Sequence, residues 1–219
     1  MSRPPPARPA LSTQRVIDAA SRVADASGLA GVSMRSVGRE LEVEAMSLYH
    51  HVASKDALLD GLTDWVFARI DAPSPSGPWR AEMEARAHSA RTVLAAHPWG
   101  LGLIESRRTP GPATLHHHDA VLGCLRAAGF SVVLAAHAFS VLDAYVYGFV
   151  LTEVNLPFQA GDSAEDFVED LGPITDLYPH LAELVAEQIV GRDYQYGDEF
   201  DYGLAIVLDG LAARFTGSA

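Results

Sequence analysis

Apolar residues recur at helical spacing through most of the chain, and the pattern is most informative between residues 33 and 59. Met34, Val37 and Leu41 fall at i, i+3 and i+7, so they share one face of a first short helix. After a tight connection, a second short helix is expected from about Glu44 to His51. Two short helices joined by a turn form the helix-turn-helix layout, in which the second helix lies in the DNA major groove.

The same periodicity predicts a helix on each side of this pair. The preceding helix starts at Ser12, whose hydroxyl can cap free backbone N–H groups, and ends at Gly28, which suits a left-handed C-terminal position. The following helix is capped by Ser54 and runs from Lys55 to about Ile70. These helices would support the pair and connect it to the rest of the chain.

The segment from Asp71 to Pro78 contains three prolines, which cannot continue a helix, so it is the clearest domain boundary. Beyond it we expect helices at Trp79 to Ala96, Leu101 to Ser106, Thr114 to Ala128, Phe130 to Thr152, His180 to Val190 and Asp198 to Phe215, with a short one around Glu165 to Leu171. No alternating strand pattern of useful length is present. The predicted fold class is all-α.

The run Leu48-Tyr49-His50-His51-Val52, followed by Lys55, resembles the DNA-binding motif of the tetracycline-repressor (TetR) family. It is most similar to the branch that contains the tetracycline repressor, whose motif also reads Leu-Tyr-x-His-Val. The similarity covers roughly Ser12 to Leu62 and continues more loosely to Gly203–Leu211. It implies a DNA-binding transcriptional repressor with a C-terminal helical domain for effector binding and dimerisation.

These observations predict three regions: a disordered N-terminal arm at 1–10, a three-helix helix-turn-helix DNA-binding domain at 11–59 with its linking helix to 70, and an effector-binding and dimerisation domain at 71–219. The Pro-rich arm lacks the apolar core of a secretory signal. The resemblance further implies a homodimer through the Phe130–Thr152 and Asp198–Phe215 helices, although the apolar stripe of the last helix fits a cap on the chain's own core equally well.

The DNA-contacting residues are expected near the start of the second motif helix and at its edges. Ser47, His50 and His51 can hydrogen-bond base edges or phosphates, whereas Ala45 and Met46 can touch a thymine methyl group. Nearest family members tend to have Pro or Gly where this chain has Met46, a departure that bears on base preference. With the contacts that the resemblance implies, the predicted set is Arg35, Glu44, Ala45, Met46, Ser47, Tyr49, His50, His51 and Lys55.

The formal net charge of −12 is unevenly distributed. Residues 1–70 carry eight Lys or Arg and eight Asp or Glu, whereas residues 71–219 carry eight and twenty. An acidic body is repelled by phosphate and favours one docking orientation. Because the N-terminal part is neutral, the motif carries the case for DNA as the partner.

The segment from Phe130 to Thr152 is apolar over nearly its whole length. A membrane span is rejected, because His137 and Asp143 would lie inside the bilayer and the flanks lack Lys/Arg clusters. Such a helix in a soluble protein is buried on several sides. Two interpretations of its polar residues stay open: a structural polar pair, or an apolar effector pocket with few polar groups. The pocket residues would be Trp99, Leu103, Ile104, Arg107, His137, Phe139, Asp143 and Tyr147.

Three adjacent histidines, His116 to His118, point about 100° apart on a helix and cannot converge on one metal ion. A solvated helix face is expected for them. Cys124 is the only cysteine, which fits a reducing cytoplasm, and is expected to be a small buried apolar residue. We expect no cofactor, no metal and no catalytic residue, since no nucleophile–base pairing or metal spacing is present. The competing classes are a protein–protein adaptor with an unused motif and a helical enzyme.

Overall fold

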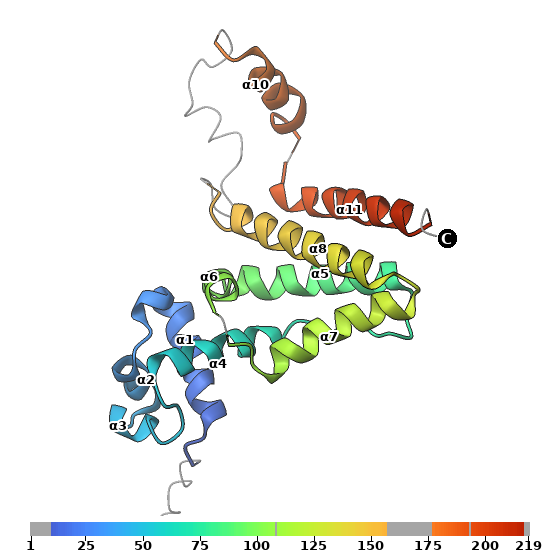
Figure 1. The fold of residues 1–219 in the computed structure, drawn as a ribbon. Coiled ribbons are helices and arrows are strands. Elements are labelled where there is room, and N and C mark those ends of the chain that lie inside the picture. Colours follow the sequence, from blue (N-terminus) through green and yellow to red (C-terminus); the bar gives the residue numbers. More distant parts are fainter. Residues whose placement is uncertain (1–9, 108, 157–176, 193, 217–219) are drawn as a thin grey trace, which may run out of the picture. The chain divides into compact units, whose positions relative to one another are not determined.

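The computed structural model describes residues 10–107, 109–156, 177–192 and 194–216 of the chain. Within these residues all regular elements are helical (Figure 1), which confirms the predicted all-α class. The α-helices are α1 Thr13–Gly31, α2 Met34–Leu41, α3 Ala45–Leu48, α4 Lys55–Phe67, α5 Trp79–Ala96, α6 Trp99–Ser106, α7 Pro112–Ala127, α8 Val132–Glu153, α10 Pro179–Leu184 and α11 Glu199–Thr216. The predicted arm, apart from its last residue, and the predicted helix around Glu165 to Leu171 lie outside the described residues.

The chain divides into two compact units, which meet between Ala135 and Ala136. The first unit contains α1 to α7, and the second contains most of α8 together with α10 and α11. The Pro-rich segment 71–78 therefore lies inside the first unit, and the domain boundary expected there remains a prediction.

Helices α1 to α4 form what we call the reading head, and serine side chains cap three of them. Ser12 accepts from the Arg15 N–H, and Ser54 accepts from the Ala57 N–H, as predicted. Ser33 forms a reciprocal capping box with Ser36 at the start of α2. Capping supplies partners for backbone N–H groups that have none inside the helix, so these three starts are determined locally.

The turn between α2 and α3 brings the two helices very close together. Glu42 adopts a left-handed conformation with φ of 55°, and the Val43 N–H then donates to the Gly38 carbonyl over 2.9 Å. A Cβ atom on Gly38 would lie 2.9 Å from the Val43 carbonyl oxygen and 3.3 Å from the Ala45 nitrogen. Only glycine at this position allows α3 to start directly against α2.

Three predicted helix ends in the reading head differ from the structure, and in the second unit the helix predicted at His180 to Val190 is an α-helix only over Pro179–Leu184. Helix α1 continues past Gly28, whose φ of 64° kinks it as the glycine signal suggested, and ends at Gly31. Helix α3 is shorter than expected, because the Tyr49 and His51 N–H groups bond to carbonyls three residues back and form a turn. For the same reason α4 ends at Phe67, and the chain reaches Ile70 through a turn.

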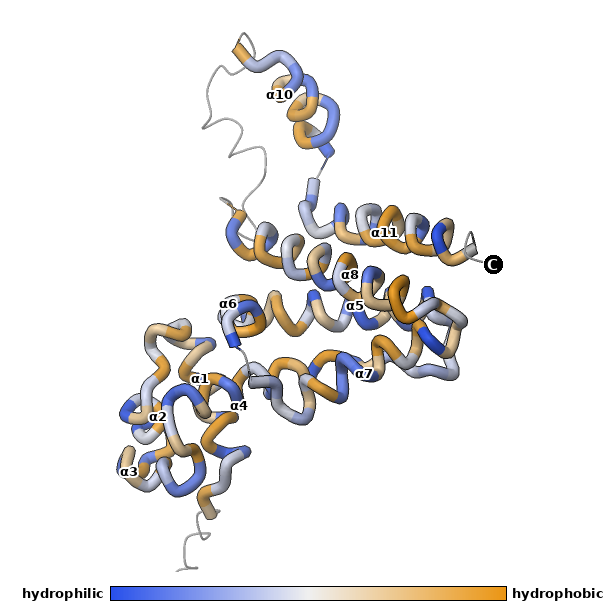
Figure 2. Tube along the Cα trace, in the orientation of Figure 1, coloured by the Kyte–Doolittle hydropathy of each residue, from blue (hydrophilic) through white to orange (hydrophobic). Residues whose placement is uncertain are grey.

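The second unit is built on the packing of α8 against α11. Tyr145 donates its hydroxyl proton to the Phe200 carbonyl over 2.8 Å, and the Phe149 ring meets Phe200 edge-on at 5.0 Å. The large apolar residues of these two helices that are buried in the chain are Leu142, Val146, Phe149, Val150, Phe200, Leu204, Leu208 and Leu211. Hydrophobic residues run along α8 well beyond these buried ones (Figure 2).

We predict that Gly38→Ala destabilises the reading head. The added methyl group meets backbone atoms, which have little freedom to move, so we expect the free energy of unfolding to fall by about 1–3 kcal/mol. Urea denaturation of the purified protein measures this change. The control is Gly123→Ala in α7, where the new Cβ meets no atom within 4 Å. An equal loss in both variants would contradict the steric explanation.

Candidate DNA-binding site and effector region

Helix α3 is anchored on one side and exposed on the other. Leu48 is completely buried, and Val52 just beyond the helix is also buried, so this side is held in the core of the head. On the outer side the exposed fraction is 73% for Met46 and 45% for Tyr49. Thr13 of α1 donates to the His51 carbonyl over 3.1 Å and holds the end of this segment.

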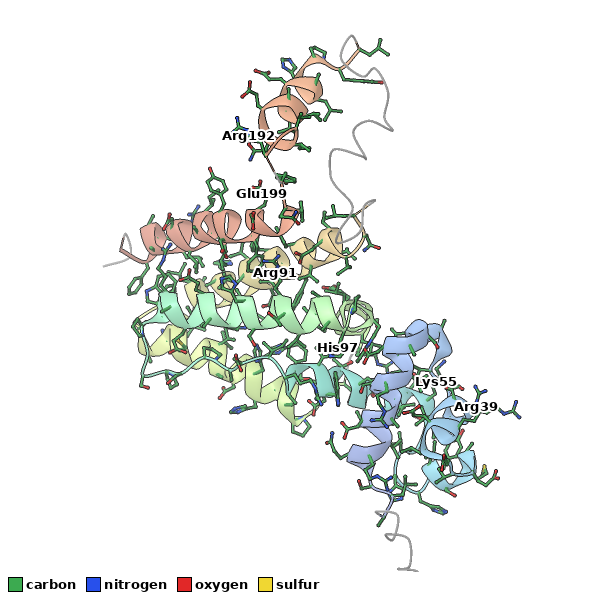
Figure 3. All side chains as sticks on the ribbon, turned by 180° about the vertical axis from the view of Figure 1, so that it is seen from behind. Arg39, Lys55, Arg91, His97, Arg192 and Glu199 are labelled. Atoms are coloured by element: carbon green, nitrogen blue, oxygen red, sulfur yellow. The ribbon has the colours of Figure 1, made fainter. Side chains whose placement is uncertain are left out.

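The remaining predicted DNA residues also lie on accessible parts of the head. Arg35, Glu44, His50 and Lys55 are exposed, and Ala45, Ser47 and His51 are half-buried. The sequence reasoning missed Arg39, which is exposed one helical turn after Arg35 on the same side of α2. Figure 3 shows Arg39 projecting away from the ribbon of the head.

Four acidic residues of the head, Asp25, Asp56, Asp60 and Asp64, contact the rest of the first unit. Asp25 of α1 accepts from the Trp99 indole N–H over 2.6 Å and lies 2.7 Å from His97 Nδ1. His97 lies where α5 ends (Figure 3). The same region is packed by aromatic contacts, since Trp65 of α4 meets His97 edge-on at 4.9 Å. These contacts join α1 and α4 to the start of α6.

A second group of contacts joins α4 to the connection between α6 and α7. Arg107, the residue that follows α6, donates through Nε to Asp60 over 2.6 Å and through Nη1 to Asp56 over 3.3 Å. This hydrogen bond to the Asp60 carboxylate is the main cause that raises the pKa of the Arg107 guanidinium. Asp64 accepts from the Thr114 N–H over 2.8 Å and so serves the first turn of α7 from another helix.

Arg107 has partners that the sequence did not reveal, and its place in an effector pocket stays a prediction. The sequence reasoning placed it among the effector-pocket residues, whereas its guanidinium binds two carboxylates of α4. Trp99, another predicted pocket residue, donates its indole N–H to Asp25. Leu103 is buried on α6, and Ile104 is half-buried.

A small pocket of about 190 Å³ opens between α1 and α4. Trp65, which lines the pocket, donates its indole N–H to the Asp18 carboxylate over 2.8 Å. The Arg69 guanidinium lies 3.2 Å above the centre of the Trp65 ring, and burial lowers the pKa of Arg69. The pocket lining is Thr13, Gln14, Ile17, Gly61, Asp64, Trp65, Ala68 and Arg69.

The histidine run is only partly solvated, which corrects the expectation for it. His116 is exposed and His118 is half-buried, but His117 is 1% exposed. Its Nε2 accepts from the Nε–H of Arg86, another buried residue, over 2.9 Å. Nδ1 of His117 must then carry the proton, and this N–H has no hydrogen-bond partner in the described structure.

Burial is the main cause that lowers the pKa of His117 to about 3, and the positive charge of Arg86 adds to it. The Ile70 backbone opposes this shift. Neutral His117 also contacts Phe67 at the end of α4, with 5.5 Å between the ring centres. A buried polar pair thus lies beside the end of α4, and sequence reasoning missed it because adjacent histidines gave no sign of which one faces inward.

In the second unit, the predicted residues fall on different sides of α8. The Tyr147 hydroxyl donates to Asp143 over 3.3 Å, and both residues are half-buried, as is Phe139. His137 is exposed, in line with Val133 and Val141 at intervals of four residues, so it does not share a face with Asp143.

Cys124 is 1% exposed, which confirms the expectation of a small buried apolar residue. Burial raises the pKa of its thiol, so the reactive thiolate is disfavoured. Among the residues that the structure describes, no group of three or more His, Cys, Asp or Glu side chains is placed to hold a metal ion.

A helix-turn-helix head that presents an exposed second helix, joined to a helical body, defines a class of DNA-binding regulators. Family models identify the class: residues 16–62 match the bacterial regulatory proteins of the tetR family, and residues 72–215 match the tetracyclin repressor-like C-terminal domain. The chain therefore belongs to the TetR family, and the predicted class of DNA-binding, ligand-responsive transcriptional repressor is confirmed.

Individual relatives agree with this assignment. The chain is 34% identical over 215 residues to the transcriptional repressor DrrR1 of Streptomyces coeruleorubidus, covering 93% of this chain and 78% of that protein. It is 32% identical over 208 residues to the class A tetracycline repressor of Escherichia coli, covering 93% and 92%. Apo ActR of Streptomyces coelicolor superposes with a TM-score of 0.79 at 26% identity, covering 97% and 100%.

The low pKa of His117 predicts a pH dependence of stability. Below pH 6.5 the unfolded chain binds a proton at His117 that the folded protein does not bind until about pH 3. Stability from this residue is therefore complete above pH 6.5 and is lost as the pH falls toward 3, by up to about 1.4 kcal/mol per pH unit. We expect His117→Asn to reduce this slope, measured by urea unfolding between pH 6.5 and 4.5. His116→Asn, at an exposed position, is the control and should keep the slope of the unchanged protein.

Proposed function

We propose that this protein represses transcription as a homodimer whose two reading heads bind successive major grooves of an operator. The observation that carries this proposal is the exposed outer side of α3, with Met46 and Tyr49 unused by the core of the head. The proposed contacts are the nine predicted residues together with Arg39. In a two-fold symmetric dimer the two heads would read half-sites about one helical turn, ~34 Å, apart.

Charge placement supports DNA as the partner of this surface. The carboxylates of Asp25, Asp60 and Asp64 accept hydrogen bonds from Trp99, Arg107 and Thr114, at α6, just after it and at α7, and so lie on the side of the head that faces these helices. Arg35, Arg39 and Lys55 stay exposed on α2 and at the start of α4. The head is neutral by count, but its exposed cations are available to phosphate.

We assign the dimer interface to the exposed sides of α8 and α11. Val141 and Leu151 are exposed on α8, and Tyr202 and Ile206 are exposed on α11. Large apolar side chains on the outer side of two packed helices favour association with another surface of the same kind. Helix α8 is also long and apolar enough to cross a membrane by length and composition, with 28% of its most apolar window buried in the chain alone. The same helix pair of a second subunit would cover this apolar surface without a membrane. We therefore place the protein in the cytoplasm.

The effector is proposed to be a small molecule bound in the C-terminal helical domain. ActR, the structural relative, has been solved in complex with actinorhodin, at a TM-score of 0.77 and 26% identity over 94% of this chain. Within the first unit we retain the predicted apolar residues Trp99, Leu103 and Ile104 of α6 as candidate contacts and add Arg86 and His117. These two bring polar groups into a buried environment, which is typical of ligand sites.

Helix α6 is the proposed connection between effector and operator. Trp99 at its start binds Asp25 of α1, and Arg107 at its end binds Asp60 of α4. An effector that moves α6 must therefore change the position of α1 and α4, and with them the spacing of the two α3 helices. This is a coupling between two sites through one two-state element.

We predict that Tyr49→Ala and Lys55→Ala weaken operator binding by about 10- to 100-fold each, because each removes contacts to base edges or phosphate in both subunits. Fluorescence anisotropy on a duplex from upstream of the protein's own gene, or selected from a random pool, measures the affinity. Loss of Lys55 should also reduce the salt dependence by about one released ion per subunit.

The control for charge is Arg192→Ala, which removes an exposed cation of the second unit. An adaptor that does not use its motif would show no salt-sensitive binding, and neither head variant would change it. That result would contradict the proposed function.

A separate prediction concerns the dimer. Ile206→Asp places a charge on the proposed interface, at a side chain that is 58% exposed in the single chain, so the fold should be kept. We expect the dimer dissociation constant to rise by about 100-fold or more, because an unpaired carboxylate would be buried. Sedimentation equilibrium measures the constant. Leu115→Asp on α7, where Leu115 is 55% exposed, is the matched control, and an unchanged dimer in the Ile206 variant would exclude this interface.

A further inference from the structure

Met46 is the most exposed large apolar side chain of the reading head, with 73% of its surface accessible. The head is folded around other residues: Leu48 carries the inward side of α3, and Val52 follows it in the core. An unbranched apolar side chain on the outer side contributes little to the stability of the head. Single exposed apolar side chains are common on protein surfaces, so it is the position of Met46 on α3, and not its exposure alone, that decides what the side chain can contact.

The position of Met46 is determined by rigid neighbours. Gly38 brings the α2 backbone against the first residue of α3, and Leu48 anchors the last residue of this short helix. Met46 is the second residue of α3, and residues at the start of a recognition helix lie closest to base edges in the major groove. The side chain is therefore presented to bases, whereas contact with the phosphates falls to the edges of the motif.

The chemistry of methionine restricts which base it can read. Its side chain has no hydrogen-bond donor, and its thioether sulfur is only a weak acceptor. It therefore cannot distinguish bases by their donor and acceptor patterns. The only apolar group that base pairs display in the major groove is the C5 methyl group of thymine. The adjacent half-buried Ala45 adds another small apolar group to the same part of the surface.

We propose that Met46 is a specificity-determining residue that reads one thymine in each operator half-site through its C5 methyl group. This inference rests on the proposed function, since it requires that α3 enters the major groove. Because the contact is to the methyl group and not to the pyrimidine edge, 5-methylcytosine at the same position is recognised in the same way. Methylation of a cytosine at this position of the operator would then strengthen binding.

The test removes or adds single methyl groups in DNA and leaves the protein fold unchanged. In a duplex that the protein binds, each symmetry-related pair of thymines is replaced by deoxyuridine, which differs only by the C5 methyl group. Affinity is measured by fluorescence anisotropy for the unaltered protein, for Met46→Ala and for Leu115→Ala, an exposed apolar control on α7.

We expect one pair of thymines whose replacement weakens binding of the unaltered protein by about fourfold per methyl group, or roughly 15-fold for the pair. Met46→Ala should bind the two duplexes equally, because the contact is already lost, and Leu115→Ala should behave as the unaltered protein. At the same pair, cytosine should bind weakly and 5-methylcytosine should recover the methyl contribution.

The result that overturns the inference is a protein that binds the operator, with every deoxyuridine effect equally large in Met46→Ala. In that case the helix-turn-helix function stands and Met46 is not the reader of the methyl group. Absence of saturable binding to any duplex would reject the proposed function itself, and with it the inference. The melting temperature of Met46→Ala should equal that of the unaltered protein, which separates a lost base contact from a damaged head.

Discussion

The carboxylates of the reading head and their partners in the body are the interactions on which the arrangement of the first unit depends. Asp25 is bound from the start of α6, and Asp60 from its end, by Trp99 and Arg107 respectively. Asp64 extends the same contact to the first turn of α7. Hydrogen bonds to charged groups are directional and stronger than apolar contacts, so they define an orientation and not merely a proximity. The orientation of α4, and so of the motif that it supports, follows from these few contacts.

This arrangement makes α6 a mechanically important element. It has only eight residues, too short to bend appreciably, and it is bound to α1 at one end and to α4 at the other. A displacement of α6 cannot keep both contacts unless α1 and α4 move with it. The polar pair of Arg86 and His117 lies beside the end of the same α4, against Phe67. The proposed coupling between body and reading head thus has two sets of contacts to act through, and both include α4.

Local features of the fold could be predicted from the sequence. The caps at Ser12 and Ser54 and the bounds Trp79–Ala96 all depend on neighbouring residues, and the structure contains each of them. The ends of α3 and α4 were predicted too late in the chain, because apolar periodicity continues through a turn of i to i+3 hydrogen bonds. A hydrophobic pattern reports which residues face inward and not which hydrogen bond ends the helix.

Contacts over long separations were beyond prediction. Trp99 lies 74 residues from Asp25, and Arg107 lies 47 from Asp60, so no spacing rule connects them. Arg107 was accordingly expected in an effector pocket, and His117 was expected on a solvated face. In both cases the tertiary partner, Asp60 for Arg107 and Arg86 for His117, could not be known from the sequence. Polar residues with a long reach, such as arginine, are the hardest to place, since their environment is decided by tertiary packing.

The positions of the charged side chains in the head are known only from the structure, because the sequence gives their number and not their partners. Residues 1–70 have equal numbers of acidic and basic side chains, a balance that weakens any electrostatic argument for DNA. The structure divides these charges by function: Asp25, Asp60 and Asp64 hold the head to the body, and Arg35 and Lys55 remain exposed. The same carboxylates that cancel the charge by count are thus used to orient the cations. Glu40, Glu42 and Glu44 stay exposed beside these cations, so the head offers phosphate individual cations and not a uniformly positive surface, and the acidic body, which phosphate repels, favours docking through the head.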